Sequence, residues 1–179
     1  MTGRLERFLA FSSKVTAYSI FELRGTGLAE AYLATVEQVV GQQVLDALLD
    51  RYDTAVAVVA ADGRAALPDL LRRELFSDPR LGPVARNLVK MWYLGIWYEL
   101  PRAWTDAYGA LQKNVTFTVS ATAYTEGLLW PSIGANPSGA KAPGYGSWAQ
   151  PPRIPATPEH PTPYPTGTTT DTTTWRSRR

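Results

Sequence analysis

Histidine and cysteine, on which many enzyme and metal sites depend, are almost missing from this sequence. The chain of 179 residues contains no cysteine and a single histidine, His160, which lies in a proline-rich stretch. Without cysteine the chain cannot form a disulfide, a thiolate nucleophile, a zinc–thiolate site or a cysteine-bound iron–sulfur cluster. A Ser–His–Asp triad would have to use His160, and a proline-rich tail holds a general base poorly. The sequence therefore predicts neither nucleophilic catalysis nor a metal site.

Two other groups of residues have spacings that can be compared with known chemistry. One is an acidic row at helical spacing beside an arginine: Asp46, Asp50, Asp53 and Arg51. Such a row is typical of an exposed helix face rather than of an acid–base pair. The other is the glycine-rich stretch 134–146, which contains neither Gly-x-Gly-x-x-Gly nor Gly-Lys-Ser/Thr, the patterns that bind phosphates. We therefore expect no catalytic and no cofactor-binding residues, and no enzyme activity in the chain alone.

Composition and charge place the chain among folded proteins without a strong electrostatic target. Hydrophobic residues make up 45% of the sequence, charged residues 19%, and the formal net charge is +2. These values disfavour disorder, nucleic-acid binding and attraction to a membrane surface. No apolar stretch reaches the roughly 18 residues that a membrane span needs. As the sequence stands we expect a cytoplasmic protein, or a periplasmic one if it is exported with a partner or if a signal has been trimmed.

Residues 1–130 carry apolar residues at helical spacing and predict a helical domain. Thr2 is expected to cap a first helix whose apolar face is Leu5, Phe8, Leu9, Ser12 and Val15. Thr26 is expected to cap a second helix, which a break at Gly41 ends. The following helix has a clear apolar face: Val44, Leu45, Leu48, Leu49 and Tyr52. Its last part, residues 56–61, is predicted to be a buried helix end.

Two more helices are predicted at prolines, which suit the first turn of a helix. Pro68 opens one that runs through Phe76, and Pro83 opens a very apolar one from Val84 to about Tyr98. Residues 114–122 alternate apolar and polar residues, but a lone strand has nothing to pair with, so an extended linker entering a short helix is favoured. The predicted fold is all-α: a small helical bundle followed by a long extended C-terminal segment rich in glycine, proline and aromatic residues.

The composition changes near residue 131, after which most of the prolines occur. Closely spaced glycine and proline prevent regular structure, yet Trp130, Tyr145 and Trp148 need a place to be buried. Either this segment folds back on the helical core or it docks on another protein, and the residues favour neither alternative. We therefore divide the chain into a helical domain, residues 1–130, and an extended partner-wrapping segment with a Pro/Thr-rich tail, residues 131–179.

Residues 124–148 resemble the small-subunit family of FAD-dependent sugar and polyol dehydrogenases, the group of the membrane-bound D-sorbitol dehydrogenase and of fructose and bacterial FAD-glucose dehydrogenases. The resemblance rests on five stretches: Tyr124-Thr125-Glu126-Gly127-Leu128-Leu129-Trp130, Ile133-Gly134-Ala135, Pro137, Gly139-Ala140-Lys141 and Pro143-Gly144-Tyr145-Gly146-Ser147-Trp148. Weaker matches are Phe8–Ser12, which looks like the opening helix of the family, and Val89–Trp97, which looks like its lysine-tryptophan-tyrosine helix. The order and rough spacing hold over about residues 4–152.

The resemblance implies a role without chemistry. In this family the FAD and the oxidising site belong to a large flavoprotein of the glucose–methanol–choline type, and some systems add a cytochrome c subunit. The chain is then expected to be a non-catalytic small subunit that stabilises the large one and helps it fold or be exported. The alternative is a dedicated chaperone, an escort that is absent from the mature enzyme.

The same resemblance implies which residues bind the large subunit. They are Trp130, Ile133, Gly134, Pro137, Gly139, Lys141, Pro143, Gly144, Tyr145, Gly146 and Trp148. The aromatic residues among them are expected to act as anchors, because aromatic side chains dominate binding at protein interfaces. The glycines would let the backbone turn and approach the partner, and Lys141 would either pair with a partner carboxylate or be solvated. Residues 90–97 are expected to be helical core rather than contact surface.

Overall fold

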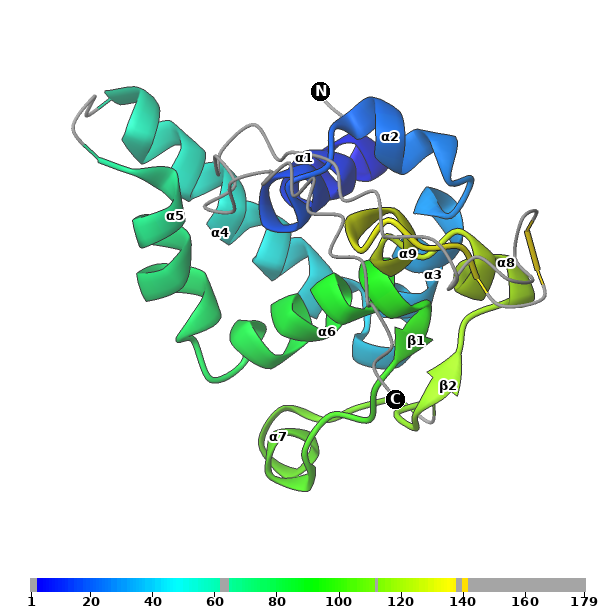
Figure 1. The fold of residues 1–179 in the computed structure, drawn as a ribbon. Helices are drawn as coiled ribbons and strands as arrows, with labels where there is room; N and C mark the ends of the chain where they lie inside the picture. The colour runs from blue at the N-terminus through cyan, green and yellow to red at the C-terminus, as the bar shows by residue number, and fades with distance from the viewer. Residues whose placement is uncertain (1–2, 62–64, 112, 138–139, 142–179) are drawn as a thin grey trace, which may run out of the picture.

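A computed structural model of the chain describes residues 3–61, 65–111, 113–137 and 140–141, and the fold in these ranges is mostly helical (Figure 1). The helices follow one another along the chain with a two-stranded sheet near the middle. Their bounds are α1 Arg4–Thr16, α2 Ile20–Gly25, α3 Ala29–Val40, α4 Gln42–Ala61, α5 Leu67–Leu70, the π-helix η1 Leu71–Phe76, α6 Leu81–Leu94, β1 Ile96–Trp97, α7 Arg102–Tyr108, β2 Phe117–Thr118, α8 Ala121–Thr125 and α9 Leu129–Ser132. The predicted helical bundle is thus confirmed. Of the predicted extended segment, residues 131–179, only 131–137 and 140–141 are described, and the rest lies outside the described residues.

The first part of the chain differs from the prediction in its helix starts. Gly3 is the cap residue of α1, and the predicted cap Thr2 lies outside the described residues. Helix α2 was not predicted, although its start is marked by a complete capping box in which Ser19 and Glu22 bond each other's backbone. Thr26 does not cap α3: it follows the end of α2, where its Oγ1 accepts a hydrogen bond from the Leu28 amide at 3.2 Å. The prediction for Thr26 was wrong because the threonine bonds within a turn.

Helix α4 is longer than the core that it packs against. Its predicted face is buried as expected, and Gly41 separates it from α3 with φ of +81°. The predicted burial of residues 56–61 is wrong, however, because these residues are helical but mostly exposed. Figure 1 shows that this end of α4 extends away from α1 and α6, with α5 beside it. Val56 and Val58 therefore face solvent, whereas Val59 is half-buried and packs against the core.

The apolar helix α6 ends earlier than predicted. It was expected to reach Tyr98, but Gly95 takes the left-handed conformation with φ of +70° and stops the helix after Leu94. The next two residues form β1, which pairs antiparallel with β2 in the register Ile96↔Thr118 and Trp97↔Phe117. The argument that a strand near residue 117 has no partner was therefore wrong. The partner is the stretch that periodicity had assigned to the helix.

The core lies where α1, α3, α4 and α6 meet around Trp92. The Trp92 ring is fully buried, edge-on to Tyr32 with centroids 4.8 Å apart, and its Nε1 donates to Ser12 Oγ at 3.0 Å. Pairing this buried N–H matters because an unpaired one would lose its bond to water without compensation. Residues 90–97 are core as predicted, with Trp97 also fully buried, whereas Lys90 is exposed over the Tyr98 ring.

The stretch after Pro101 forms the helix α7, which was not predicted. Trp104 fixes it to the bundle by donating from Nε1 to the Arg80 carbonyl at 2.7 Å. No helix in the described part of the chain combines the length and the apolar character that crossing a membrane requires.

Candidate partner-binding surface

Two glycines bring the segment 120–128 into backbone contact with the end of α6. A Cβ on Gly95 would lie 2.4 Å from the Ala123 carbonyl oxygen, and a Cβ on Gly127 would lie 2.7 Å from the Tyr93 carbonyl oxygen. Any other residue at either position would place its Cβ too close to these carbonyl groups, so the backbone would have to shift. The contact is closed by hydrogen bonds from the Val119 amide to Gly95 and from the Leu128 amide to Trp92, each 3.0 Å long. The beginning of the segment that carries the family resemblance, residues 124–128, is therefore built onto the helical core.

Two tyrosines tie the loop after α1 to the end of this segment. The Tyr18 hydroxyl lies 2.8 Å from Ser132 Oγ and donates toward the Leu128 carbonyl at 3.3 Å. Tyr93 Oη donates to the Thr16 carbonyl at 2.8 Å, and its ring is edge-on to Tyr18. Burial raises the pKa of Tyr93, and the neighbouring Tyr18 raises it further, so this hydroxyl keeps its proton and acts as a donor.

Trp130 is half-buried and its position is fixed by an aromatic neighbour. Its Nε1 donates to the Tyr124 carbonyl at 2.7 Å, and the two rings are edge-on with centroids 5.4 Å apart. Ile133 follows α9 with 42% of its surface exposed, and Tyr124 is also exposed. The predicted anchor Trp130 is thus part of the folded unit, and the apolar surface offered to solvent is supplied by its two neighbours.

The chain turns after α9 and comes back beside α8. Gly134 supports the turn with φ of +64°, and the Ala135 amide donates to the Trp130 carbonyl at 2.9 Å. Pro137 is buried. Lys141 Nζ then lies 2.7 Å from both carboxylate oxygens of Glu126, so the ion pair considered for a partner is made within the chain.

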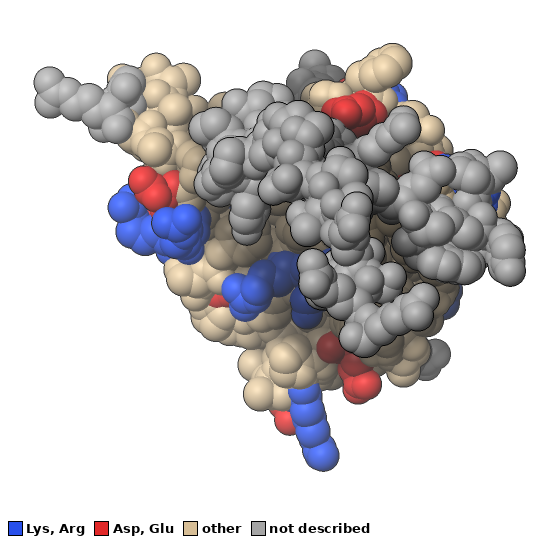
Figure 2. Space-filling view, viewed as in Figure 1, with Lys and Arg blue, Asp and Glu red and all other residues tan. Residues whose placement is uncertain are grey.

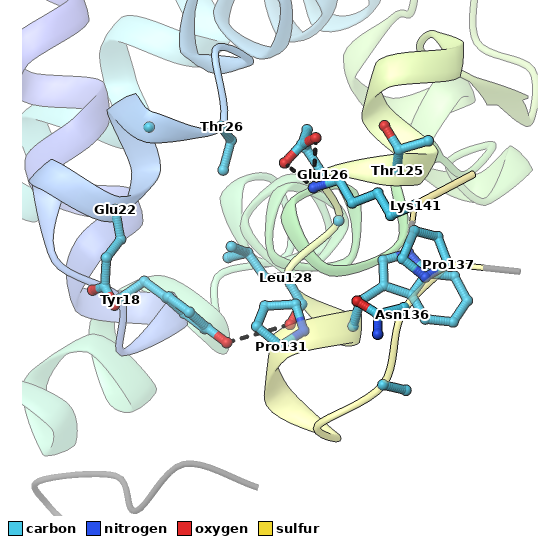
Figure 3. A pocket seen from close by; sticks show the side chains of 14 residues that line it. Tyr18, Glu22, Thr26, Thr125, Glu126, Leu128, Pro131, Asn136, Pro137 and Lys141 are labelled. Carbon is cyan, nitrogen blue, oxygen red and sulfur yellow. Dashed lines mark hydrogen bonds and ion pairs between the residues drawn. The ribbon is translucent and has the colours of Figure 1, made fainter. Parts of the chain in front are cut away.

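A pocket of about 420 Å³ lies between α2 and the α8–α9 segment (Figure 3). Its lining combines apolar side chains with hydrogen-bonding ones: Tyr18, Glu22, Gly25, Thr26, Thr125, Glu126, Gly127, Leu128, Trp130, Pro131, Ala135, Asn136, Pro137 and Lys141. Figure 3 shows the Glu126–Lys141 pair at one side of the pocket and the Tyr18 hydroxyl pointing toward α9 at the other. A recess of this kind can accept a side chain of a partner, with apolar contacts below and polar groups at the rim.

Five of the predicted partner-binding residues lie in this region: Trp130, Ile133, Gly134, Pro137 and Lys141. The other six lie outside the described residues: Gly139, Pro143, Gly144, Tyr145, Gly146 and Trp148. The predicted domain boundary after residue 130 falls inside α9. Sequence reasoning missed the contribution of Tyr18 and α2 to the pocket, although the Ser19–Glu22 capping spacing was the signal that could have found α2.

The acidic row of α4 has a structural role. Asp50 and Asp53 bind Arg7 of α1, with N···O distances of 2.6 and 2.7 Å, and Asp46 binds Arg4 at 3.0 Å. The hydrogen bond to Asp50 is the largest of the causes that raise the pKa of Arg7. These pairs fasten α1 to α4 at the surface. Among the residues that the structure describes, no three His, Asp or Glu side chains gather in a way that could hold a metal ion.

Comparisons of the chain with models of protein families, with curated proteins and with solved structures find no match. The resemblance to the dehydrogenase small subunits therefore stays a prediction.

Proposed function

We propose that this chain is a non-catalytic small subunit of a heteromeric FAD-dependent sugar or alcohol dehydrogenase, with a large flavoprotein of the glucose–methanol–choline type as its partner. The FAD and the oxidising site would belong to that partner, and this chain would stabilise it and help it fold or be exported. A complex of this kind can also include a cytochrome c subunit.

The observation that carries the proposal is the surface formed by residues 124–137. This stretch has the first residues of the resemblance, and close glycine contacts and backbone hydrogen bonds hold its beginning, up to Leu128, against α6. It presents exposed Tyr124 and Ile133 next to a pocket, so apolar surface is offered on a rigid support. Rigid support favours tight association because little conformational freedom is lost on binding.

Co-expression of the chain with a large flavoprotein of the glucose–methanol–choline type from the same organism tests the proposal. We expect Ile133→Asp to reduce recovery of the complex at least tenfold, because a charge would be buried without a partner at the interface. The matched control is Val58→Asp, which has the same exposed fraction, 42%, but lies on α4 and outside the surface formed by residues 124–137. Equal recovery with the two variants would contradict the proposed surface.

The stoichiometry of the purified enzyme separates the subunit from the chaperone alternative. A subunit should be present at one copy per flavin, whereas an escort should be missing from the mature enzyme while still raising its yield. A flavoprotein that is fully folded and active after expression without this chain would contradict both the subunit and the chaperone alternative.

A further inference from the structure

A second pocket lies on a part of the chain that the proposed function does not use. It has a volume of about 410 Å³ and lies between the last turn of α1 and the α5–η1 segment. Its lining residues are Lys14, Val15, Leu67, Pro68, Leu71, Arg72 and Phe76. The volume is within the range of roughly 300–1,000 Å³ that small-molecule sites occupy.

The walls of this pocket are apolar. Val15, Leu67 and Phe76 are half-buried side chains that pack against the core, and Leu71 is buried. One side of these side chains packs against the core, and the other side lines the pocket. An alkyl chain placed there would remove apolar surface from water at about 25 cal/mol per Å².

The charged groups that line the pocket are both cations, and no described residue of its lining is acidic. Lys14 makes no ion pair with any other described residue. Arg72 lies 3.3 Å from Asp69, but their side chains are 79% and 70% exposed, so another carboxylate can replace Asp69 at little cost. Figure 2 shows a group of basic side chains over α5 and the segment that follows it, with an acidic group beside them.

The backbone at the pocket is also unusual. Leu71, Arg72 and Phe76 belong to the π-helix η1, in which the Ser77 amide donates to the Arg72 carbonyl five residues before it at 3.2 Å. π-helical turns are rare and often occur at functional sites. This observation is independent of the charges and of the apolar walls.

We propose that this pocket binds an amphiphilic carboxylate: its alkyl chain lies on Val15, Leu67 and Phe76, and its carboxylate lies between Lys14 and Arg72. The proposal does not depend on the dehydrogenase role. The anionic end satisfies the two cations, and the alkyl chain covers the apolar walls.

The test is a titration of the full chain with decanoate, kept below its micelle concentration and followed by backbone amide NMR shifts. We expect saturable shifts confined to residues 14–15 and 67–76. Lys14→Gln and Arg72→Gln should each weaken binding about threefold, because exposed ion pairs contribute modestly, and Asp69→Asn should strengthen it about twofold. Arg73→Gln is the matched control, since Arg73 pairs with Glu74 and does not line the pocket.

Probes that lack either the alkyl chain or the carboxylate distinguish this proposal from simpler explanations. Acetate should not bind at the concentrations used, and decanol and decyltrimethylammonium should bind at least tenfold more weakly than decanoate. Equal binding of the cationic amphiphile would mean unspecific partition into an apolar patch and would overturn the proposal. Shifts spread over the whole chain, or decanoate affinity unchanged in the Lys14→Gln, Arg72→Gln double variant, would overturn it as well.

Discussion

At the scale of single residues, glycine decides where the segment 120–128 can lie. Gly95 has two separate reasons to be glycine: a φ of +70° and a neighbouring carbonyl where a Cβ would be. Gly109 has only the first reason, because its φ is +73° and nothing lies within 4 Å of the position of a Cβ. Comparing substitutions at Gly95 and Gly109 therefore separates the cost of backbone strain from the cost of steric contact.

Replacing each of these glycines by alanine should lower the free energy of unfolding by different amounts. We expect about 3 kcal/mol for Gly95→Ala, from strain and overpacking together, and about 1 kcal/mol for Gly109→Ala, from strain alone. Urea denaturation followed by circular dichroism measures both. Losses of equal size would show that the contact between Gly95 and Ala123 is not tight in solution.

At the scale of elements, α2 is the helix that depends most on its cap. It has six residues, one buried side chain, Leu23, and an 85%-exposed Phe21, so packing contributes little to it. The capping box compensates: Ser19 Oγ accepts from the Glu22 amide at 3.2 Å, and the Glu22 carboxylate accepts from the Ser19 amide at 2.8 Å. The wall of the first pocket formed by Glu22, Gly25 and Thr26 depends on this box.

Ser19→Ala should destabilise the chain by about 1 kcal/mol at neutral pH, while Ser19→Asn, which keeps an acceptor, should change stability little. The Ser19 hydroxyl is the main cause that lowers the pKa of Glu22 from its ordinary 4.5, and the Ser19 amide adds to it. Because the folded pKa is lowered, this stabilisation is present above about pH 4.5 and is lost as the pH falls through the lower folded value. An NMR titration of Glu22 should show a higher midpoint in Ser19→Ala, and an unchanged midpoint would contradict this role.

At the scale of the whole molecule, one core joins the ends of the described chain. The same buried cluster contains Phe8 of α1, Trp92 of α6 and Leu128 before α9. The segment 120–128 adds to it through Ala123 and through backbone bonds to α6. The candidate partner-binding surface therefore cannot unfold without opening the packing around Trp92.

We expect a single cooperative unfolding transition, because elements that share a core of this size lose it together. Far-ultraviolet circular dichroism, which follows the helices, and near-ultraviolet circular dichroism, which follows the packed aromatic rings, should give coincident denaturation curves. A surface segment that melts first would appear as a near-ultraviolet change at lower denaturant, and that result would contradict the shared core.

Local patterns were enough to predict most helices and their buried faces. Val44 to Tyr52 in α4 and Pro68 at the start of α5 follow from spacing and proline geometry, which act over a few neighbouring residues. The family resemblance named five candidate partner-binding residues in the described part of the chain, and three of them, Trp130, Pro137 and Lys141, line the pocket. The failures at Thr26 and at residues 56–61 show the limit of such patterns, since a threonine can bond within a turn and an apolar helix end can extend beyond its neighbours.

Only the tertiary structure decided which distant residues meet. Pairing of Ile96–Trp97 with Phe117–Thr118, the bond between Tyr18 and Ser132, and the gathering of Lys14 with Arg72 at one pocket all join residues far apart in the chain. Periodicity carries no information on such distances, because they are set by how the helices pack around Trp92. The sequence by itself therefore determined most helices and the positions at which glycine can end or turn the chain. Packing of the helices determined the strand pair, the ion pair between Lys141 and Glu126, and both pockets.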